Sequence, residues 1–477
     1  MIDIVGGSPL ATNPYNRLSA QGRQTLLDLL GPDGARASAE DLQAYAYDGT
    51  FLERRPDLVA LPSTTEQVAA IVQLAARERV PVVTRGAGSG LAGGSVPLAG
   101  GIVVSLTRMN QVVEWDLVNM LVRVQPGVVT ADLKAEALAR GLFYPPDPAS
   151  QKQATLGGNA AMGAGGPHGL KYGTTKDYVL GLEAVTADGR VMRSGGKMIK
   201  NVTGYNLTQL LVGSEGTLAI ITELTLRLLP KPRASRTAMA VFPRIDDASR
   251  MITIILNAGV IPATIEIMDQ ASLRCVEEVQ HAGLPVEAEA VLLIDLDGEP
   301  AAIEVQLRDV ARLCAEHGAS EVRVAADAEE SARLWTARRV VSSSLARIRP
   351  TKLGEDISVP RSAIPEALAA VRAIAARYDL LIPVYGHISD GNLHPNILFD
   401  RHDPEEVERV NRAAAEIFEA AVALGGTLTG EHGIGSLKKE FLTMALDPIE
   451  LALMRRVKAA FDPDGILNPG KIFPNDR

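Results

Sequence analysis

The chain contains the stretch Arg85-Gly86-Ala87-Gly88-Ser89-Gly90-Leu91-Ala92-Gly93-Gly94-Ser95, directly after the apolar segment Pro81-Val82-Val83-Thr84. The apolar segment has the length and character of a buried strand. Glycines adopt left-handed backbone conformations freely, so N–H groups in a glycine-rich loop can converge on an anion that no Cβ keeps at a distance. The sequence therefore predicts a strand followed by a phosphate-binding loop.

This loop does not match the fingerprint of NAD-binding domains. That fingerprint requires a helix straight after the loop and an acidic residue about 20 positions later, which holds a ribose hydroxyl. Positions 105–108 are Ser-Leu-Thr-Arg instead. For this stretch alone, a flexible glycine-rich turn is the alternative interpretation.

Two further glycine-rich stretches change the balance between these interpretations. They are Thr155-Leu156-Gly157-Gly158-Asn159-Ala160-Ala161-Met162-Gly163-Ala164-Gly165-Gly166 and Val212-Gly213-Ser214-Glu215-Gly216-Thr217-Leu218. Both lie between predicted strands. Three such loops indicate one long ligand that the backbone contacts at several points.

The pattern of apolar residues predicts the organisation of the chain. We expect helices at 64–79 and 130–140, strands at 81–84, 102–106, 111–115, 121–124, 180–187 and 218–228, and irregular loops at 154–173 and 194–216. From 239 onward strands alternate with long helices, which predicts an α+β sheet layered by helices. The expected segments are an N-terminal helical segment at 1–53, a first domain at 54–232, a second domain at 233–435 and a C-terminal helical segment at 436–477 that returns to the first domain.

Composition excludes several classes of function. The net charge is -9 with 48 Lys and Arg against 57 Asp and Glu, so no excess of cations is present for binding nucleic acid. No apolar run approaches the length of a membrane span, and we expect a cytoplasmic protein, or one held at a membrane only through a partner. The two cysteines, Cys275 and Cys314, cannot hold an iron–sulfur cluster by themselves. Electrons would therefore leave to an external acceptor.

A second group of residues lies in the C-terminal half. His387 and His394 flank the turn signal Asp390-Gly391-Asn392, and a hairpin-like reversal there would bring both imidazoles together. Glu431 follows in Gly430-Glu431-His432-Gly433. Two imidazoles and one carboxylate are a common ligand set for Zn²⁺, Mn²⁺ or Fe²⁺. The alternative is a set of polar loop residues that bond one another.

The glycine loops and their surroundings resemble the FAD-binding domain of the vanillyl-alcohol oxidase and p-cresol methylhydroxylase family. Residues 85–95 are similar to its pyrophosphate loop, 146–173 to its isoalloxazine loop, and 213–222 to the segment under the adenosine. The resemblance implies the cofactor contacts Arg85, Gly86, Ala87, Gly88, Ser89, Gly90, Pro146, Asp147, Thr155, Gly157, Gly158, Asn159, Gly163, Gly165, Gly166, Tyr172, Gly173, Glu215, Gly216, Ile220, Ile221 and Asn468. Ser89 stands where some members carry a tethering histidine, so we expect non-covalent FAD, with His168 as the nearest candidate for a tether.

The second group resembles the C-terminal domain of the FAD-linked 2-hydroxy-acid dehydrogenases, and the two resemblances together cover about 54–474. The resemblance implies an α+β substrate (cap) domain with an antiparallel sheet beside a flavin domain of two subdomains. It also implies His387, His394 and Glu431 as metal ligands, His432 as catalytic base, Arg338 as the partner of the substrate carboxylate, and Asn396 as a substrate-side polar group. The segment 461–471 corresponds to a stretch near the flavin. Ser389 departs from the usual glycine, and Lys352 has no secure counterpart.

The resemblance implies oxidation of a small 2-hydroxy acid, of the glycolate or D-lactate type, by hydride transfer to FAD. A D-2-hydroxyglutarate-type dehydrogenase and a non-catalytic FAD subunit that relays electrons are the alternatives. An iron–sulfur subunit, an electron-transfer flavoprotein and a quinone are all acceptable electron acceptors.

Overall fold

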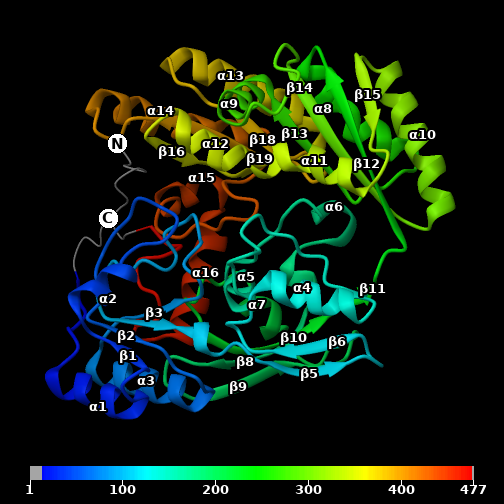
Figure 1. Ribbon diagram of the computed structural model, residues 1–477. Coiled ribbons are helices and arrows are strands. Elements are labelled where there is room, and N and C mark those ends of the chain that lie inside the picture. Colours follow the sequence, from blue (N-terminus) through cyan, green and yellow to red (C-terminus); the bar gives the residue numbers. More distant parts are fainter. Residues whose placement is uncertain (1–12, 475–477) are drawn as a thin grey trace. The chain divides into compact units, whose positions relative to one another are not determined.

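The computed structural model describes residues 13–474 and divides them into two compact units (Figure 1). The N-terminal unit contains the described residues up to Ala164, Thr174–Lys231 and the chain from Glu431 onward. The central unit contains Gly165–Gly173 and Pro232–Gly430. Among the helices of residues 13–474, none has both the length and the apolar character needed to cross a membrane.

A four-stranded sheet forms the first part of the N-terminal unit. Its order is β1 (Ala35–Arg36), β2 (Leu58–Ala60), β4 (Ile102–Ser105), β3 (Val82–Arg85), with β2, β4 and β3 parallel. Parallel strands are buried on both faces. The face with Leu58, Val82 and Ile102 packs in one core with α1 (Ala20–Leu30) and α3 (Thr65–Glu78). The opposite face packs with residues of and after α2 (Ala39–Ala44).

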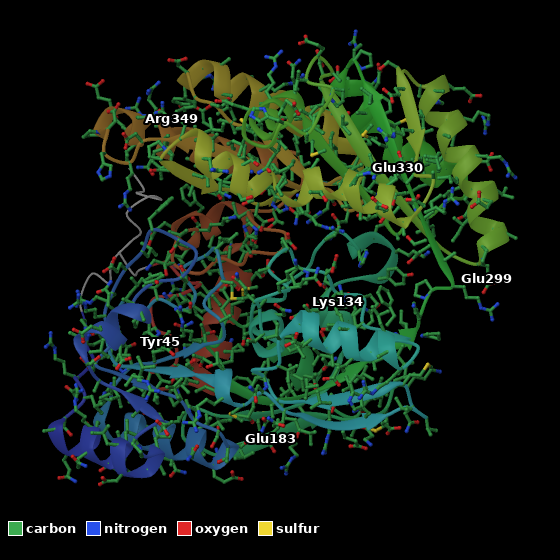
Figure 2. The ribbon with its side chains drawn as sticks, viewed as in Figure 1. Tyr45, Lys134, Glu183, Glu299, Glu330 and Arg349 are labelled. Carbon is green, nitrogen blue, oxygen red and sulfur yellow. The ribbon has the colours of Figure 1, made fainter. Side chains whose placement is uncertain are left out.

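A five-stranded antiparallel sheet forms the second part of this unit. Its order is β5 (Val112–Asp116), β6 (Leu121–Val124), β10 (Ile220–Arg227), β8 (Val179–Val185), β9 (Val191–Gly195). Glu183 of β8 accepts hydrogen bonds from Thr65 of α3 at 2.7 Å and from Thr222 of β10 at 3.1 Å, and so links α3 to this sheet (Figure 2). The remaining elements are α4 (Thr130–Ala139), α5 (Leu156–Met162), α7 (Leu207–Leu211), the 3-10 turns Leu106–Arg108 and Thr175–Asp177, and the pair β7 (Leu142–Phe143) with β11 (Leu229–Pro230).

The C-terminal segment belongs to the N-terminal unit. It contains a 3-10 turn (Lys439–Phe441), α15 (Leu442–Ala445) and α16 (Pro448–Phe461). Beyond α16, Leu467 forms a parallel bridge to Val82 of β3, because the Val82 N–H donates to the Ile466 carbonyl at 2.8 Å and the Asn468 N–H donates to the Val82 carbonyl at 2.7 Å. The end of the chain thereby lies beside the strand that precedes the glycine loop.

The expected loops at 154–173 and 194–216 are partly wrong, because each contains helical turns. α5 forms although it contains Gly157 and Gly158, since the Thr155 hydroxyl caps it by accepting from the Gly158 N–H. A Cβ at Gly157 would collide with Pro126, so the small residue permits close packing that offsets its poor helix propensity. α6 (Gly169–Tyr172) and α7 are the other short helices in these ranges.

The central unit is built on an eight-stranded antiparallel sheet. The path is β15 (Glu321–Val324), β12 (Ala234–Phe242), β14 (Ala290–Gly298), β13 (Thr264–Asp269), β18 (Val384–His387), β19 (Asn392–Phe399), β16 (Thr351–Gly354), with β17 (Ile357–Ser358) also paired to β19. The alternation of strands and helices seen from residue 239 thus gives the expected α+β layer.

Helices cover this sheet. α9 (Gln270–Gln280), α11 (Ala328–Arg339) and α12 (Val341–Ile348) share a core with the sheet residues Met239, Met268 and Leu293. α8 (Ile245–Asn257) and α10 (Pro300–Glu316) lie against β12 and β14, and α13 (Ile364–Tyr378) packs on α14 (Pro404–Ala423). A 3-10 turn at Arg361–Ala363 precedes α13. Gly165–Gly173 belongs to this unit because Lys171 and Tyr172 bond the Asp297 carboxylate.

Candidate functional site

The predicted reversal between His387 and His394 is a β-hairpin of β18 and β19. In the register of this hairpin, Tyr385 lies opposite His394 and His387 lies opposite Asn392. Opposite residues of antiparallel strands project from the same face of a sheet. The two imidazoles therefore meet, with their Nε2 atoms 3.5 Å apart and their ring planes at 85°. Both side chains are buried.

The hairpin turn forms although Ser389 replaces the expected glycine. Asp390 donates its N–H to the His387 carbonyl at 3.3 Å, and its carboxylate accepts from the Asn392 N–H. Gly391, with φ of 86°, takes the left-handed position in the turn, so Ser389 does not need to. A serine is compatible with this turn for that reason.

Two buried carboxylates lie behind the imidazoles. Glu266 of β13 is opposite His387 in the sheet and bonds its Nδ1 atom. Asp356 lies 3.8 Å from Nδ1 of His394, and it accepts from the Thr429 hydroxyl at 2.5 Å and the Gly430 N–H at 3.0 Å. A carboxylate at Nδ1 favours the tautomer in which that nitrogen carries the proton and Nε2 presents a lone pair. The Nε2 atom of His387 is then an electron-pair donor that faces His394.

Arg338 and Asn396 lie in the same part of the central unit. Arg338 of α11 donates from Nε to Glu266 Oε2 at 2.6 Å, and its guanidinium carbon lies 4.5 Å from the Tyr385 ring centre. Asn396 donates its amide to the His394 carbonyl at 2.7 Å and is 1% exposed. The central unit thus brings together four of the predicted residues: His387, His394, Arg338 and Asn396.

This donor set fits a divalent cation. Two ligand nitrogens about 2.1 Å from one tetrahedral metal lie about 3.4 Å from each other, close to the observed Nε2 separation. A carboxylate that holds the opposite ring nitrogen, as Glu266 does for His387, is the usual outer partner of a metal-bound histidine.

The N-terminal unit contains a partly open cavity. Seven glycines line it, from the loop after β3, from α5 and from the 213–218 loop: Gly86, Gly88, Gly90, Gly94, Gly157, Gly158 and Gly216. A Cβ on Gly90 would meet no protein atom within 4 Å, so its backbone faces open space. Bare backbone along an elongated cavity suits a dinucleotide, whose phosphates and rings can approach the N–H groups closely.

Side chains behind the cavity hold its loops in place. Arg85 is buried, donates to the Tyr47 carbonyl at 2.6 Å and lies 5.5 Å from the ring centre of Tyr45 (Figure 2). Gly88 has φ of 73°, and a side chain there would collide with the Arg85 guanidinium. Lys134 of α4, also labelled in Figure 2, donates to the Pro146 carbonyl at 3.1 Å and forms an ion pair with Asp147. Arg85, Lys134 and Asp147 shape the loops rather than line the cavity.

The predicted cofactor residues fall into two groups. Those that line the cavity are Gly86, Ala87, Gly88, Ser89, Gly90, Thr155, Gly157, Gly158, Asn159, Glu215, Gly216 and Ile221. Arg85, Pro146, Asp147, Gly163, Ile220 and Asn468 belong to the same unit outside the lining, and Gly165, Gly166, Tyr172 and Gly173 belong to the central unit. His168 is also in the central unit, where its ring packs edge-on against Tyr172.

Glu431 and His432 line the cavity of the N-terminal unit. They follow Gly430 directly in the chain, and the Gly430 N–H bonds Asp356 of the central unit. Glu431 and His432, which the resemblance implies as third metal ligand and catalytic base, thus belong to the N-terminal unit, and Gly430 before them belongs to the central unit.

Two buried groups of the N-terminal unit have strongly shifted pKa values. Burial raises the pKa of the Glu215 carboxyl to about 7, although N–H donors from Ile434 and Gly435 favour its charged form. Burial lowers the pKa of Lys471 to about 7, and its ammonium group donates to the Gly93 and Val96 carbonyls and the Ser436 hydroxyl. Lys471 therefore joins the end of the chain to the segment after the glycine loop.

Sequence reasoning missed Glu266 and Asp356. A signal for Glu266 exists, because it is an acidic residue in the middle of the otherwise apolar strand Thr264-Ile265-Glu266-Ile267-Met268. Its partners, however, are 72 and 121 residues away in the chain. Asp356 follows Glu355 in Gly354-Glu355-Asp356, a pattern that alone does not distinguish a buried carboxylate from an exposed turn.

Comparison with known proteins gives two family matches. The family described as "FAD linked oxidases, C-terminal domain" matches residues 231–472 of this chain. The family described as "FAD binding domain" matches residues 56–195. The glycolate oxidase subunit GlcD of Bacillus subtilis is 45% identical over 455 residues, which are 95% of this chain and 97% of that protein. A D-lactate dehydrogenase of Anaerostipes hadrus is 36% identical over 431 residues, which are 88% of this chain and 90% of that protein.

Solved structures share the fold. p-Cresol methylhydroxylase with substrate bound superposes with a TM-score of 0.78 at 19% identity, over 95% of this chain and 96% of that one. 4-Ethylphenol oxidase from Gulosibacter chungangensis, in an isoeugenol complex, gives the same TM-score and identity over 96% of this chain and 99% of that one.

Proposed function

The chain belongs to the FAD-linked oxidases, and from that premise we propose that it oxidises a small 2-hydroxy acid, of the glycolate or D-lactate type, to the 2-oxo acid. The observation that supports this substrate class is the pair of imidazoles in the central unit, with Nε2 atoms 3.5 Å apart and a carboxylate behind each ring. A 2-hydroxy acid offers a hydroxyl and a carboxylate oxygen on adjacent carbons, which together chelate a cation.

FAD is the redox cofactor of the proposal, bound without a covalent link. Ser89 lines the cavity, and neither Cys275 nor Cys314 does. The residues that would hold FAD are the glycines of the cavity with Ala87, Ser89, Thr155, Asn159 and Ile221. When bound, FAD supplies an acceptor for the hydride that leaves C2 of the substrate.

The proposed metal ligands are His387, His394 and Glu431, the last chosen by its place in the chain. The cation is Zn²⁺, Mn²⁺ or Fe²⁺, each of which suits two imidazoles and a carboxylate. When bound, it supplies positive charge next to the substrate oxygens, which favours loss of the hydroxyl proton.

Three residues of the chain act directly on the proposed substrate. His432 takes the hydroxyl proton as general base. Arg338 pairs with Glu266 through both Nε and Nη2, which leaves Nη1 to point toward the substrate carboxylate. The Asn396 amide nitrogen donates to the His394 carbonyl. The side-chain oxygen of Asn396 is therefore the atom that would accept from a substrate hydroxyl or water.

A D-2-hydroxyglutarate-type substrate is the second candidate, and Lys352 favours it. Lys352 lies on β16, two residues before Gly354, which pairs with Asn396. Its ammonium group donates to the Ser342 hydroxyl at 2.6 Å, and burial lowers its pKa. The Lys352 ammonium group, two positions from the strand partner of Asn396, is suited to bind the second, distal carboxylate of a hydroxyglutarate-type substrate.

Stopped-flow reduction of the FAD-loaded protein with a panel of D- and L-2-hydroxy acids tests the function. We expect glycolate or a D-2-hydroxy acid to bleach the flavin. His432→Ala should retain FAD and lose about 10²-fold or more in the rate of flavin reduction, because a positioned base contributes about that much. A wild-type flavin that no hydroxy acid reduces would instead indicate an electron-relay subunit. Reoxidation of the reduced protein by an iron–sulfur subunit, an electron-transfer flavoprotein or a quinone then identifies the acceptor.

A further inference from the structure

Glu215 holds the turn that follows His432. Its Oε1 atom accepts from the Ile434 N–H at 2.8 Å, and its Oε2 atom accepts from the Gly435 N–H, also at 2.8 Å. Both oxygens of one carboxylate are therefore used on two consecutive N–H groups. These donors are two and three residues beyond His432.

Glu215 is itself held rigidly. Its N–H donates to the Ala161 carbonyl of α5 at 2.8 Å, and its carbonyl accepts from the Asn468 amide at 2.7 Å. Its backbone adopts φ of 54°, a conformation that costs a non-glycine residue free energy and that its surroundings must impose. The side chain is 6% exposed.

The turn after His432 is closely packed at two glycines. Gly433 has φ of 89°, and a Cβ there would meet Met162 at 2.6 Å and Glu215 Oε1 at 2.9 Å. Gly435 has φ of 51°, and a Cβ there would collide with the Ala92 carbonyl. The two glycines let the backbone approach Glu215 closely enough for both hydrogen bonds.

We propose that Glu215 is a positioning residue for His432, whose carboxylate fixes the direction in which the chain presents that imidazole. This inference rests on the proposed role of His432 as base. It changes the expectation that Glu215 serves FAD, because both carboxylate oxygens are used by the protein backbone. The cofactor then meets the backbone of residues 214–216 rather than this carboxylate.

Glu215→Gln tests the proposal, since an amide has nearly the same size but turns an NH₂ group toward one of the two N–H donors. We expect FAD content and the FAD dissociation constant to stay within about threefold of wild type. The rate of flavin reduction by substrate should fall about 10²-fold, the loss typical of a catalytic group displaced by about 1 Å. Glu223→Gln, which changes a carboxylate of the neighbouring strand β10, is the matched control and should behave as wild type.

A double-mutant cycle shows whether Glu215 acts through His432. If it does, Glu215→Gln should cause little further loss in a protein that already carries His432→Ala, because coupled residues are not additive. Losses in the rate of flavin reduction that multiply in the double mutant would overturn the proposal, and so would a Glu215→Gln protein that retains no FAD. Glu215→Asp provides a second variant. If neither Glu215→Gln nor Glu215→Asp accumulates as FAD-loaded protein, the proposal is also overturned.

Hydrogen exchange of the FAD-loaded full chain tests the contact without any substrate. The Ile434 and Gly435 amides should exchange slowly in the wild type and at least tenfold faster in Glu215→Gln. Equal exchange in the two proteins would contradict the proposal. A wild type that no hydroxy acid reduces would contradict the proposed function alone, because the exchange measurement does not depend on it.

Discussion

At the scale of single residues, Glu266 serves two groups at once. It is 2% exposed, and its two carboxylate oxygens meet Nδ1 of His387 and the guanidinium of Arg338. A buried carboxylate without such partners would be costly, and a buried cation beside it would be equally costly alone. Glu266 therefore sets the tautomer of one proposed ligand and the orientation of the proposed carboxylate-binding arginine.

Glu266→Gln should weaken both metal binding and substrate binding. An amide at this place can no longer accept from both His387 and Arg338. We expect a 10- to 100-fold loss in affinity for the divalent metal, the usual effect of changing an outer partner of a histidine ligand. Metal content after dialysis and calorimetric titration with Zn²⁺ or Mn²⁺ measure this directly.

The control for Glu266→Gln is Glu299→Gln, which removes the same charge from an exposed ion pair with Arg233 (Figure 2). The Michaelis constant should rise in Glu266→Gln and stay unchanged in the control. Wild-type metal affinity in Glu266→Gln would contradict the assignment of His387 as a ligand.

At the scale of elements, the N-terminus of α9 depends on a buried aspartate. Asp269 is the last residue of β13 and the N-cap of α9, where it accepts from the Ser272 N–H at 2.8 Å and from the Val384 N–H at 2.9 Å. Burial raises its pKa to about 6, against these hydrogen bonds that lower it. One carboxylate thus joins β13, α9 and β18, next to the hairpin that carries His387.

Asp269→Asn should change how stability depends on pH. The folded state binds the Asp269 proton more tightly than the unfolded state, so this group contributes stability that is fully present below about pH 4 and is lost as the pH rises to about 6. The asparagine variant should therefore be less stable than wild type near pH 4, and the difference should shrink toward pH 6. Urea unfolding midpoints at several pH values measure it.

The matched control is Asp327→Asn at the exposed N-cap of α11, which accepts from the Glu330 N–H. Asparagine caps a helix about as well as aspartate, so this change should cost little stability, with no comparable change between pH 4 and 6. If the stability difference between Asp269→Asn and wild type is constant from pH 4 to 6, Asp269 does not bind a proton in the folded state over this range.

At the scale of the whole molecule, the glycine-lined cavity and the imidazole pair lie in separate units. The glycine-lined cavity belongs entirely to the N-terminal unit, whereas the imidazole pair with its carboxylates belongs entirely to the central unit. The chain passes between the units next to Gly165, Gly173, Pro232 and Gly430. Each unit folds around its own core, so loss of a ligand from one need not release a ligand from the other.

Removal of the metal should therefore leave FAD in place. After treatment with a chelator such as EDTA, we expect an unchanged flavin content and visible spectrum, together with loss of flavin reduction by substrate. Return of Zn²⁺, Mn²⁺ or Fe²⁺ should restore reduction, and the ion that restores it best identifies the metal. Full reduction by a hydroxy acid in the chelated, metal-free protein would refute the proposed role of the cation.

The sequence by itself determined the features whose signals are local. The strand before the glycine loop, the helix expected at 64–79 and the hairpin between His387 and His394 all depend on residues a few positions apart, and each formed close to the expected positions. The glycines of the loops were also local signals, since a missing Cβ acts at its own position.

Only the tertiary structure decided which buried groups meet. Glu266 reaches His387 across 121 residues, and Glu215 reaches Gly435 across 220. Such pairs leave no periodic pattern, because either residue alone is compatible with a solvated carboxylate. The assignment of Gly165–Gly173 to the central unit likewise depends on Asp297, which is more than a hundred residues away. Distant side chains become partners only when burial removes water as the alternative, and burial is a property of the folded chain.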